Sequence, residues 1–231
     1  YNIKTSAQGQ DNLNIKMLLY CCPFIIPYLT HIINTCLLNR FFPDSWKVAV
    51  VRPIPKMNNP QDFKDLRPIS ILPTMSKVLE RVVDLQIREY ANKYNIIPQF
   101  QSGFRLQHSC ETALMCITDD ILRGLDEKKV TVLTLIDFSK AFDTLNYEVL
   151  FALLKYLGFA HCTIQFFRNY FKNREQCVKI GDNISTLLEI TSGVAQGSII
   201  GPLLFMLYTS TIDQAIDKCK FHLYADDTQI Y

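Results

Sequence analysis

The sequence predicts an α+β fold in which an antiparallel sheet is backed by helices. Two short segments that look like strands, residues 221–224 and 228–231, are separated by only three residues, which is typical of two strands joined by a tight turn. A third run, residues 130–136, is short and almost continuously apolar, as expected for a strand covered on both faces. Helical patterns lie between these strands, and this order favours layered packing of helices on a sheet.

The other elements follow in chain order. Residues 27–40 predict a buried helix of a soluble protein, because Pro23, Pro27 and several polar residues interrupt the uncharged stretch 17–38 and argue against a membrane span. Residues 47–55 predict a strand that leads into a polar loop. Apolar spacing predicts helices at 76–93, 110–125, 147–157, 163–172 and 200–217, and a hairpin over 176–190 that turns at 181–183.

The composition is that of a folded protein, with 48% hydrophobic and 20% charged residues, which excludes a disordered chain. The eight cysteines form no CxxC pair and the four histidines complete no zinc pattern, so a zinc module is not predicted. A disulfide framework is not expected either, and a reducing, intracellular compartment is the default. The net charge is only +2, with the basic excess before residue 110 and the acidic excess after it. This split suits a protein that binds polyanions with one part and cations with the other, and it also arises by chance.

The most informative local feature is the sequence Tyr224-Ala225-Asp226-Asp227 between two strands. Two adjacent carboxylates at a hairpin tip repel each other unless a cation lies near them. A bound Mg²⁺ is the usual partner because hard cations prefer oxygen ligands. The alternative is a solvated turn, since Asp is common in turns.

Asp137 ends the apolar run 130–136. A lone Asp at this position is commonly a polar stop or a helix cap. If its strand neighbours the 221–231 hairpin, Asp137 joins Asp226 and Asp227 in a cluster of three carboxylates. Such a cluster can hold two metal ions about 3.5–4 Å apart, the arrangement used for in-line phosphoryl transfer.

Two further features are weaker. The segment 192–198 (SGVAQGS) has two glycines within five residues, which permits a tight turn and close approach of the backbone to a ligand. Lys56 and Arg67 lie in a Pro-bounded region and have the side chains that bind phosphate oxygens. Either could equally be an ordinary surface charge.

Six segments together resemble the sequence blocks of reverse transcriptases, in the same order. They are VRPIPK (51–56), DLRPISILPTMSKVLERVV (65–83), QSGFRLQHSCETAL (101–114), LIDFSKAFDTLNYEVL (135–150), SGVAQGSIIGPLLFMLY (192–208) and YADD (224–227). The blocks are most similar to those of non-LTR (LINE-like) retrotransposons, in which Ala225 is the usual second residue of YADD. The resemblance implies the fingers and palm of a right-hand polymerase, with a single domain over 1–231, an N-terminal helical extension at about 1–45, and no thumb before Tyr231.

The resemblance also implies roles for individual residues. Asp137 and Asp226 would be metal ligands, with Asp227 completing the catalytic acidic cluster. The expected cofactor is a pair of Mg²⁺ ions, with Mn²⁺ as an alternative. Lys56 and Arg67 would hold the incoming triphosphate.

Six more positions carry expectations from the resemblance. The carbonyl of Phe138 would be an additional ligand, and Gln196 and Gly197 would line the nucleotide and template pocket. Phe142 falls at the position that discriminates between sugars, where the alternative is plain core packing. Tyr224 would pack near the primer end. Asp143 is expected to be structural or a helix cap.

The implied function is RNA-directed DNA synthesis by two-metal nucleotidyl transfer, with an RNA template, a DNA primer or target and dNTPs as partners. The resemblance further implies a longer polyprotein with an endonuclease domain, no membrane, and a place in the nucleus. An isolated 231-residue piece is then expected to be weakly active or inactive. Two alternatives stay open: a silent nucleic-acid-binding remnant of a decayed element, and an intron maturase whose RNA binding outweighs its catalysis.

Overall fold

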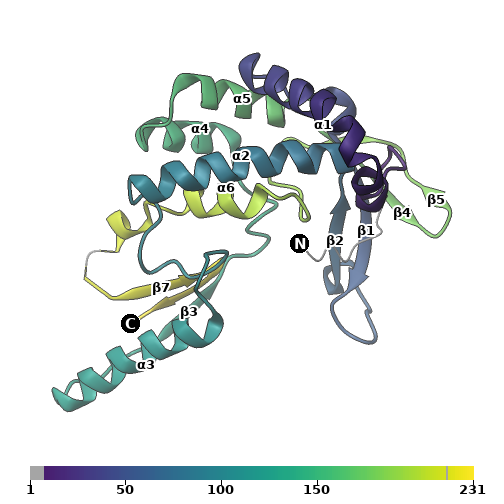
Figure 1. Cartoon of the computed structure of the whole chain (residues 1–231). Coiled ribbons are helices and arrows are strands. Elements are labelled where there is room, and N and C mark those ends of the chain that lie inside the picture. Colours follow the sequence, from purple (N-terminus) through teal and green to yellow (C-terminus); the bar gives the residue numbers. More distant parts are fainter. Residues whose placement is uncertain (1–7, 217) are drawn as a thin grey trace.

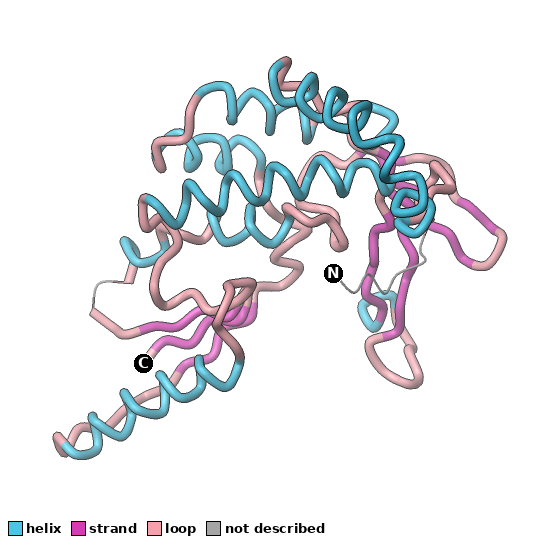
Figure 2. The backbone as a smooth tube through the Cα atoms, viewed as in Figure 1, coloured by secondary structure: helices cyan, strands magenta, loops and turns pink. Residues whose placement is uncertain are grey.

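Two β-sheets lie on the same side of a layer of helices (Figure 1). The structure is a computed structural model that describes residues 8–216 and 218–231. Figure 2 shows the strands as two separate groups, with most of the helices above them and one long helix below the smaller group. The predicted combination of helices and strands is therefore confirmed.

The smaller sheet is antiparallel, as predicted. It has the strand order β3 (Thr134–Asp137), β8 (Asp227–Ile230), β7 (Phe221–Tyr224). Tyr224 pairs with Asp227, so the turn of this hairpin contains only Ala225 and Asp226. Asp227 is thus the first residue of β8 rather than part of the turn, because the two strands stay paired up to that position.

The larger sheet has the order β2-β1-β4-β5, with β6 also paired to β4. Its strands are β1 (Val48–Pro55), β2 (Leu66–Ile71), β4 (Glu175–Ile180), β5 (Asn183–Ile184) and β6 (Leu188–Glu189). β1 and β2 form an antiparallel hairpin, whereas β1 and β4 run parallel. The hairpin predicted within 176–190 is confirmed, with Gly181 in its turn at φ +59°.

A layer of four helices supplies most of the core. They are α2 (Thr74–Lys93), α4 (Tyr147–Tyr156), α5 (His161–Phe171) and α6 (Gly201–Tyr208). On α2 the buried residues Leu79, Val83 and Ile87 recur every four positions, which makes one apolar stripe that faces the other helices. A further helix, α3 (Cys110–Asp126), begins at the N-cap Ser109 and lies beside the small sheet (Figure 1).

The helix predicted at 27–40 is longer and far less buried than expected. It is α1 (Ile15–Leu38), which continues through Pro23 and Pro27 and buries only Ile33 and Cys36. Each proline removes one backbone hydrogen bond but leaves the rest of the ladder intact, so the helix is not interrupted. Within the described part of the chain, α1 is long and apolar enough to cross a membrane, which by itself is weak evidence. The expectation of no membrane partner stays a prediction, as does the division of domains with its extension at 1–45, whose first seven residues lie outside the described ranges.

The strand predicted at 130–136 is not covered on both faces. β3 begins only at Thr134, and Leu135 is 71% exposed. β3 is an edge strand that pairs with β8 on one side, and the described residues leave its faces open to solvent. Apolar composition predicted the strand correctly, but its cover depends on what packs against it.

The helix predicted at 200–217 ends early. α6 stops at Tyr208 and a short 3₁₀ turn, η3 (Ile212–Ala215), follows, while residue 217 lies outside the described residues. The hydroxyls of Thr209 and Ser210 donate to the carbonyls of Phe205 and Leu207. Such side-chain bonds compete with the helical ladder and favour its end. Pro202 lies in the first turn, as predicted.

Candidate active site

One cleft of about 1070 Å³ lies at the ends of both sheets. It is lined by eight of the ten residues singled out from the sequence, namely Lys56, Arg67, Asp137, Phe138, Phe142, Gln196, Gly197 and Asp226. These residues come from segments up to 170 positions apart, so the fold has brought them together. Asp227 and Tyr224 are not among the residues that line it.

The acidic side of the cleft is built on the small sheet. Asp137 ends β3 and pairs directly with Asp227 at the start of β8, while Asp226 occupies the adjoining turn. Partial desolvation, and then the charges of Asp226 and Asp137, raises the pKa of the Asp227 carboxyl. The charges of Asp226 and Asp137 therefore act on the carboxyl group of Asp227, as the predicted cluster requires.

The basic side of the cleft comes from the β1–β2 hairpin. Lys56 follows β1, and Arg67 lies on β2, where it pairs with Ile54. The ammonium group of Lys56 donates to the carbonyl of Lys64, 3.0 Å away, so this lysine is held toward the hairpin loop. Lys64 and Lys140 also line the cleft, which raises its positive charge beyond what was predicted from the sequence.

The glycine-rich segment 192–198 forms one wall, and its backbone is tightly constrained. Gly197 has φ +130°, and a Cβ there would collide with the carbonyl oxygen of Ser70, so only glycine fits. Ser70 N in turn donates to the carbonyl of Gln196 (2.8 Å). The close approach of the backbone at this loop is to β2, and its predicted approach to a ligand stays a prediction.

Asp143 has a structural role here. Its Oδ1 accepts a hydrogen bond of 3.0 Å from Nε2 of Gln196, which orients that side chain at the cleft. The alternative of a helix cap is wrong, because Asn146 is the N-cap of α4 and accepts from Val149 N.

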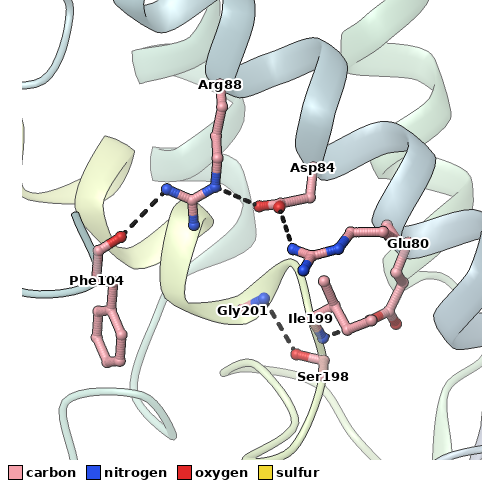
Figure 3. Close-up of polar contacts among 8 residues, drawn as sticks. Glu80, Asp84, Arg88, Phe104, Ser198, Ile199 and Gly201 are labelled. Carbon is pink, nitrogen blue, oxygen red and sulfur yellow. Dashed lines mark hydrogen bonds and ion pairs between the residues drawn. The ribbon is translucent and has the colours of Figure 1, made fainter. Parts of the chain in front are cut away.

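The helix α2 holds the loops on both sides of the cleft (Figure 3). Buried Glu80 accepts a 2.7 Å hydrogen bond from Ile199 N, just before α6. It accepts another from the hydroxyl of Tyr170. Burial raises the pKa of Glu80, an effect that the nearby Arg174 opposes. Four residues further along α2, buried Asp84 accepts a hydrogen bond from the guanidinium of Arg88. The same guanidinium donates to the carbonyl of Phe104 (3.2 Å).

Aromatic rings pack beside the acidic residues. Phe142 is half-buried, and its ring centroid lies 4.7 Å from that of Phe205 and 6.0 Å from that of Phe104. The ring therefore packs against the core and also lines the cleft, and its role in discriminating between sugars stays a prediction. Phe138 is exposed at the same site.

Sequence reasoning missed several lining residues. Phe104 and Lys140 lie inside quoted sequence blocks, and their positions next to the predicted residues were the available signal. Phe63, which is 90% exposed, had no such signal because it follows a polar loop.

The acidic residues suit a hard divalent cation by their chemistry, since all of them offer carboxylate oxygens. The charges of Asp226 and Asp137 disfavour ionisation of Asp227, and a bound cation relieves repulsion of this kind. In their present rotamers, however, no three His, Cys, Asp or Glu side chains of the described residues lie close enough to hold a metal ion. A three-ligand site would thus need these side chains to turn toward one another.

Comparisons with known proteins point to one protein family. Residues 54–231 match the family described as reverse transcriptase (RNA-dependent DNA polymerase). The chain is 32% identical over 207 residues to the probable RNA-directed DNA polymerase from transposon BS of Drosophila melanogaster, covering 89% of this chain and 23% of the relative. It is 28% identical over 232 residues to the RNA-directed DNA polymerase from mobile element jockey of the same species, covering 97% of this chain and 25% of the relative. The chain thus spans about a quarter of the length of these relatives.

Solved structures show the same fold. Telomerase from Candida albicans, in complex with a fragment of telomeric RNA, superposes with a TM-score of 0.55 at 13% identity, covering 80% of this chain and 38% of that one. Apo telomerase from Candida tropicalis gives the same score, with 80% and 43% covered. With the fold, the sequence blocks and the family match in agreement, this chain belongs to the reverse transcriptase family and is a reverse transcriptase domain of the non-LTR retrotransposon type.

Proposed function

We propose that this chain carries the polymerase site of an RNA-directed DNA polymerase that extends a primer 3′-hydroxyl with dNTPs. The observation that supports this most directly is a single cleft lined by Asp137 and Asp226 and also by Lys56 and Arg67. Carboxylates suit cation binding and the two basic residues suit a triphosphate, and phosphoryl transfer needs both. Family membership supports the same reaction class.

In this reaction the primer 3′-oxygen attacks the α-phosphorus of the dNTP, and pyrophosphate leaves. Lys56 and Arg67 would offset the negative charge of the triphosphate, Arg67 through its planar fork and Lys56 as a point charge. To do so, Lys56 must exchange its bond to the Lys64 carbonyl for a phosphate oxygen. The backbone at Gln196 and Gly197, which has no side chain in the way at position 197, would face the base pair being formed.

Asp137 and Asp226 would hold two Mg²⁺ ions, or Mn²⁺, with Asp227 and the carbonyl of Phe138 as further ligands. When bound, such ions supply charge stabilisation of the phosphoryl group and orient the attacking and leaving oxygens. The chain's own contribution is to place Asp137 at the end of β3, opposite Asp227 at the start of β8, with Asp226 in the adjoining turn. Asp227 is exposed at that position and can turn toward a cation without disturbing the core.

The partners of the whole protein are also part of this proposal. An RNA template and a DNA primer or target are inferred from the polymerase names of the relatives. Because those relatives are about four times as long as this chain, we infer further domains, among them an endonuclease, and action in the nucleus. Tyr224 would pack near the primer end, although its side chain lies beside Cys110 of α3, whose thiol raises the pKa of the tyrosine.

Primer extension on poly(rA)/oligo(dT) tests the proposal. The assay uses this chain and, in parallel, the longer protein that carries it, with Mg²⁺ and with EDTA. We expect dTTP incorporation that depends on Mg²⁺. Specific RNA binding without incorporation by the longer protein, with Mg²⁺ or Mn²⁺, would favour a silent binding remnant instead.

A further inference from the structure

We propose that Gln101 is a positioning residue for the turn that carries Asp226. Its side-chain oxygen holds the backbone of Ala225 and thereby sets where the Asp226 carboxylate enters the cleft. The inference rests on the proposed function of Asp226, but the contacts that carry it are independent of that function. Gln101 does not line the cleft, so it would act through the turn and touch no substrate.

Two hydrogen bonds to its oxygen orient the side-chain amide of Gln101. The side chain is 1% exposed, and Oε1 accepts hydrogen bonds from Gly103 N (2.8 Å) and Ala225 N (3.2 Å). Its Nε2 is buried and finds no partner among the described residues. An unpaired buried donor is costly, so the two bonds to the oxygen must be what keeps this side chain in place.

The turn has a reason to need such a partner. Ala225 has φ +59°, in the left-handed region that residues with a Cβ adopt at a cost. Strained backbone of this kind persists only where the surroundings hold it. Ala225 N has its hydrogen-bond partner in Gln101, and Ala225 itself is buried.

The segment that contains Gln101 is fastened along β7. Leu223 N donates to the carbonyl of Phe100, and Ser102 N donates to the carbonyl of Leu223, both at 2.8 Å. This adds a short parallel bridge to the edge of the small sheet. At Gly103 a Cβ would collide with Ala225 N, so the segment can approach the turn this closely only with glycine there.

The far end of the same segment is tied to the helix layer. Arg88 of α2 donates to the carbonyl of Phe104 and is itself held by buried Asp84 at 2.9 Å (Figure 3). A chain of contacts therefore runs from α2 through Phe104 and Gln101 to the Ala225–Asp226 turn. A displaced catalytic group can cost about a hundredfold in rate, so the placement of this turn matters for turnover.

The test replaces Gln101 with Met, which keeps the length of the side chain and removes both acceptor bonds. Amide hydrogen exchange followed by NMR, without metal or substrate, should show the Ala225 amide exchanging at least about tenfold faster, as expected when its hydrogen bond is lost. Gln101→Glu keeps an acceptor oxygen and should retain the protection of Ala225. In primer extension, Gln101→Met should lower kcat about 10- to 100-fold and leave the KM for dNTP within about twofold, because the triphosphate contacts are untouched.

Ser102→Ala is the matched control. Ser102 is the next residue, is 2% exposed, and loses a 2.8 Å hydrogen bond to His222 in this variant, but it makes no bond to the turn. In Ser102→Ala, the protection of the Ala225 amide from hydrogen exchange should be unchanged, and kcat should stay within about twofold of wild type. The lost hydrogen bond to His222 lies away from the reacting groups. A general loss of packing would instead change Ala225 amide exchange and kcat to a similar extent in both variants.

Three results would overturn the proposal. The first is a wild-type Ala225 amide that exchanges as fast as an open turn, a measurement that needs no variant to fold. The second is equal Ala225 protection in Gln101→Met and wild type, and the third is equal kcat in Gln101→Met and Ser102→Ala. If instead the longer wild-type protein that carries this chain extends no primer while Ala225 is protected through Gln101, the proposed function fails and the structural role stands.

Discussion

Asp137, Asp226 and Asp227 lie together at one end of the small sheet, with Asp137 directly opposite Asp227 and Asp226 in the adjoining turn. The charges of Asp226 and Asp137 contribute to the raised pKa of Asp227, which is a direct sign that the three groups interact. A solvated turn would not place a third carboxylate, from 89 residues earlier in the chain, directly opposite the pair. At the scale of single residues, this placement of three carboxylates is what the proposed cation site requires, and the cation site itself stays a prediction.

Asp137→Asn and Asp226→Asn should each abolish primer extension. Each change replaces a charged ligand with a neutral amide of nearly the same shape, so a metal ion would lose its main attraction while the fold is kept. Extension on poly(rA)/oligo(dT) measures the loss, and circular dichroism checks that both variants are folded. Near-wild-type extension by either variant would remove the two-metal assignment.

Phe142→Val should improve the use of UTP relative to dTTP. A rigid ring beneath the sugar excludes the 2′-hydroxyl by a clash, which is more effective than any loss of attraction. The ring also packs on Phe205, so the variant should lose roughly 1–3 kcal/mol of stability for the reduced burial. The measurement is the ratio of kcat/KM for dTTP and UTP on one template, together with a melting curve. A lowered melting temperature with an unchanged ratio would leave Phe142 as a core residue only.

At the scale of elements, the β1–β2 hairpin brings positive charge to the cleft. Lys56 directly follows β1 and Arg67 lies on the adjoining strand β2. The carbonyl of Asp65 accepts a 2.8 Å hydrogen bond from Lys56 N, which fixes the backbone there. The exposed positions of both side chains keep them free to meet an incoming anion.

Lys56→Ala and Arg67→Ala should each weaken dNTP use. The loss of one charge-assisted phosphate contact is worth on the order of 1.5–3 kcal/mol, and we expect it mainly in the KM for dNTP. Lys155→Ala, an exposed lysine on α4 that does not line the cleft, is the matched control. If KM and kcat/KM stay at the wild-type values in both hairpin variants, these side chains are surface charges.

The contact between α2 and the start of α6 sets the position of the glycine-rich wall. Glu80→Ala removes the acceptor for Ile199 N and Tyr170 Oη, and leaves buried Arg174 without its nearby carboxylate. We expect a loss of about 1–3 kcal/mol for the unsatisfied groups, seen as a fall in melting temperature of several degrees. Glu89→Ala, an exposed carboxylate on the same helix, should shift the melting temperature by less than about 2 °C. Equal shifts in the two variants would contradict the role given to Glu80.

At the scale of the whole molecule, the pH dependence of stability should report on the contact between residues 101–102 and β7. Burial, and then the charge of His108, lowers the pKa of His222, which shares a hydrogen bond with Ser102. The unfolded chain then binds a proton more readily than the folded one, so stability is full above about pH 6.5 and is lost as the pH falls below that value. The slope from one such group is at most about 1.4 kcal/mol per pH unit.

His222→Gln should flatten this part of the pH profile. Melting temperatures of the wild type between pH 7.5 and 5 should fall by up to about 2–4 °C per unit from this group, and the variant should fall by less. Parallel profiles would show that other groups dominate acid stability.

Much of this protein could be predicted from local sequence. The Tyr224–Asp227 hairpin, the stripe of α2 and the turn at Gly181 follow from turn chemistry and from the spacing of apolar residues, which act over a few positions. The six quoted sequence blocks indicated the family, because such blocks keep their order along the chain even where overall identity to a relative is near 30%.

Other features depended on partners distant in the chain. The sequence of α1 and β3 predicted burial, yet α1 buries only Ile33 and Cys36 and β3 is exposed, because burial is decided by what packs on an element and not by its own composition. The same holds at the site: the sequence by itself determined which residues could carry the chemistry. Only the tertiary structure decided that Lys56, Phe104 and Asp226 share one cleft, and that Gln101 holds the turn. Such contacts join positions more than a hundred residues apart, beyond the reach of any local pattern.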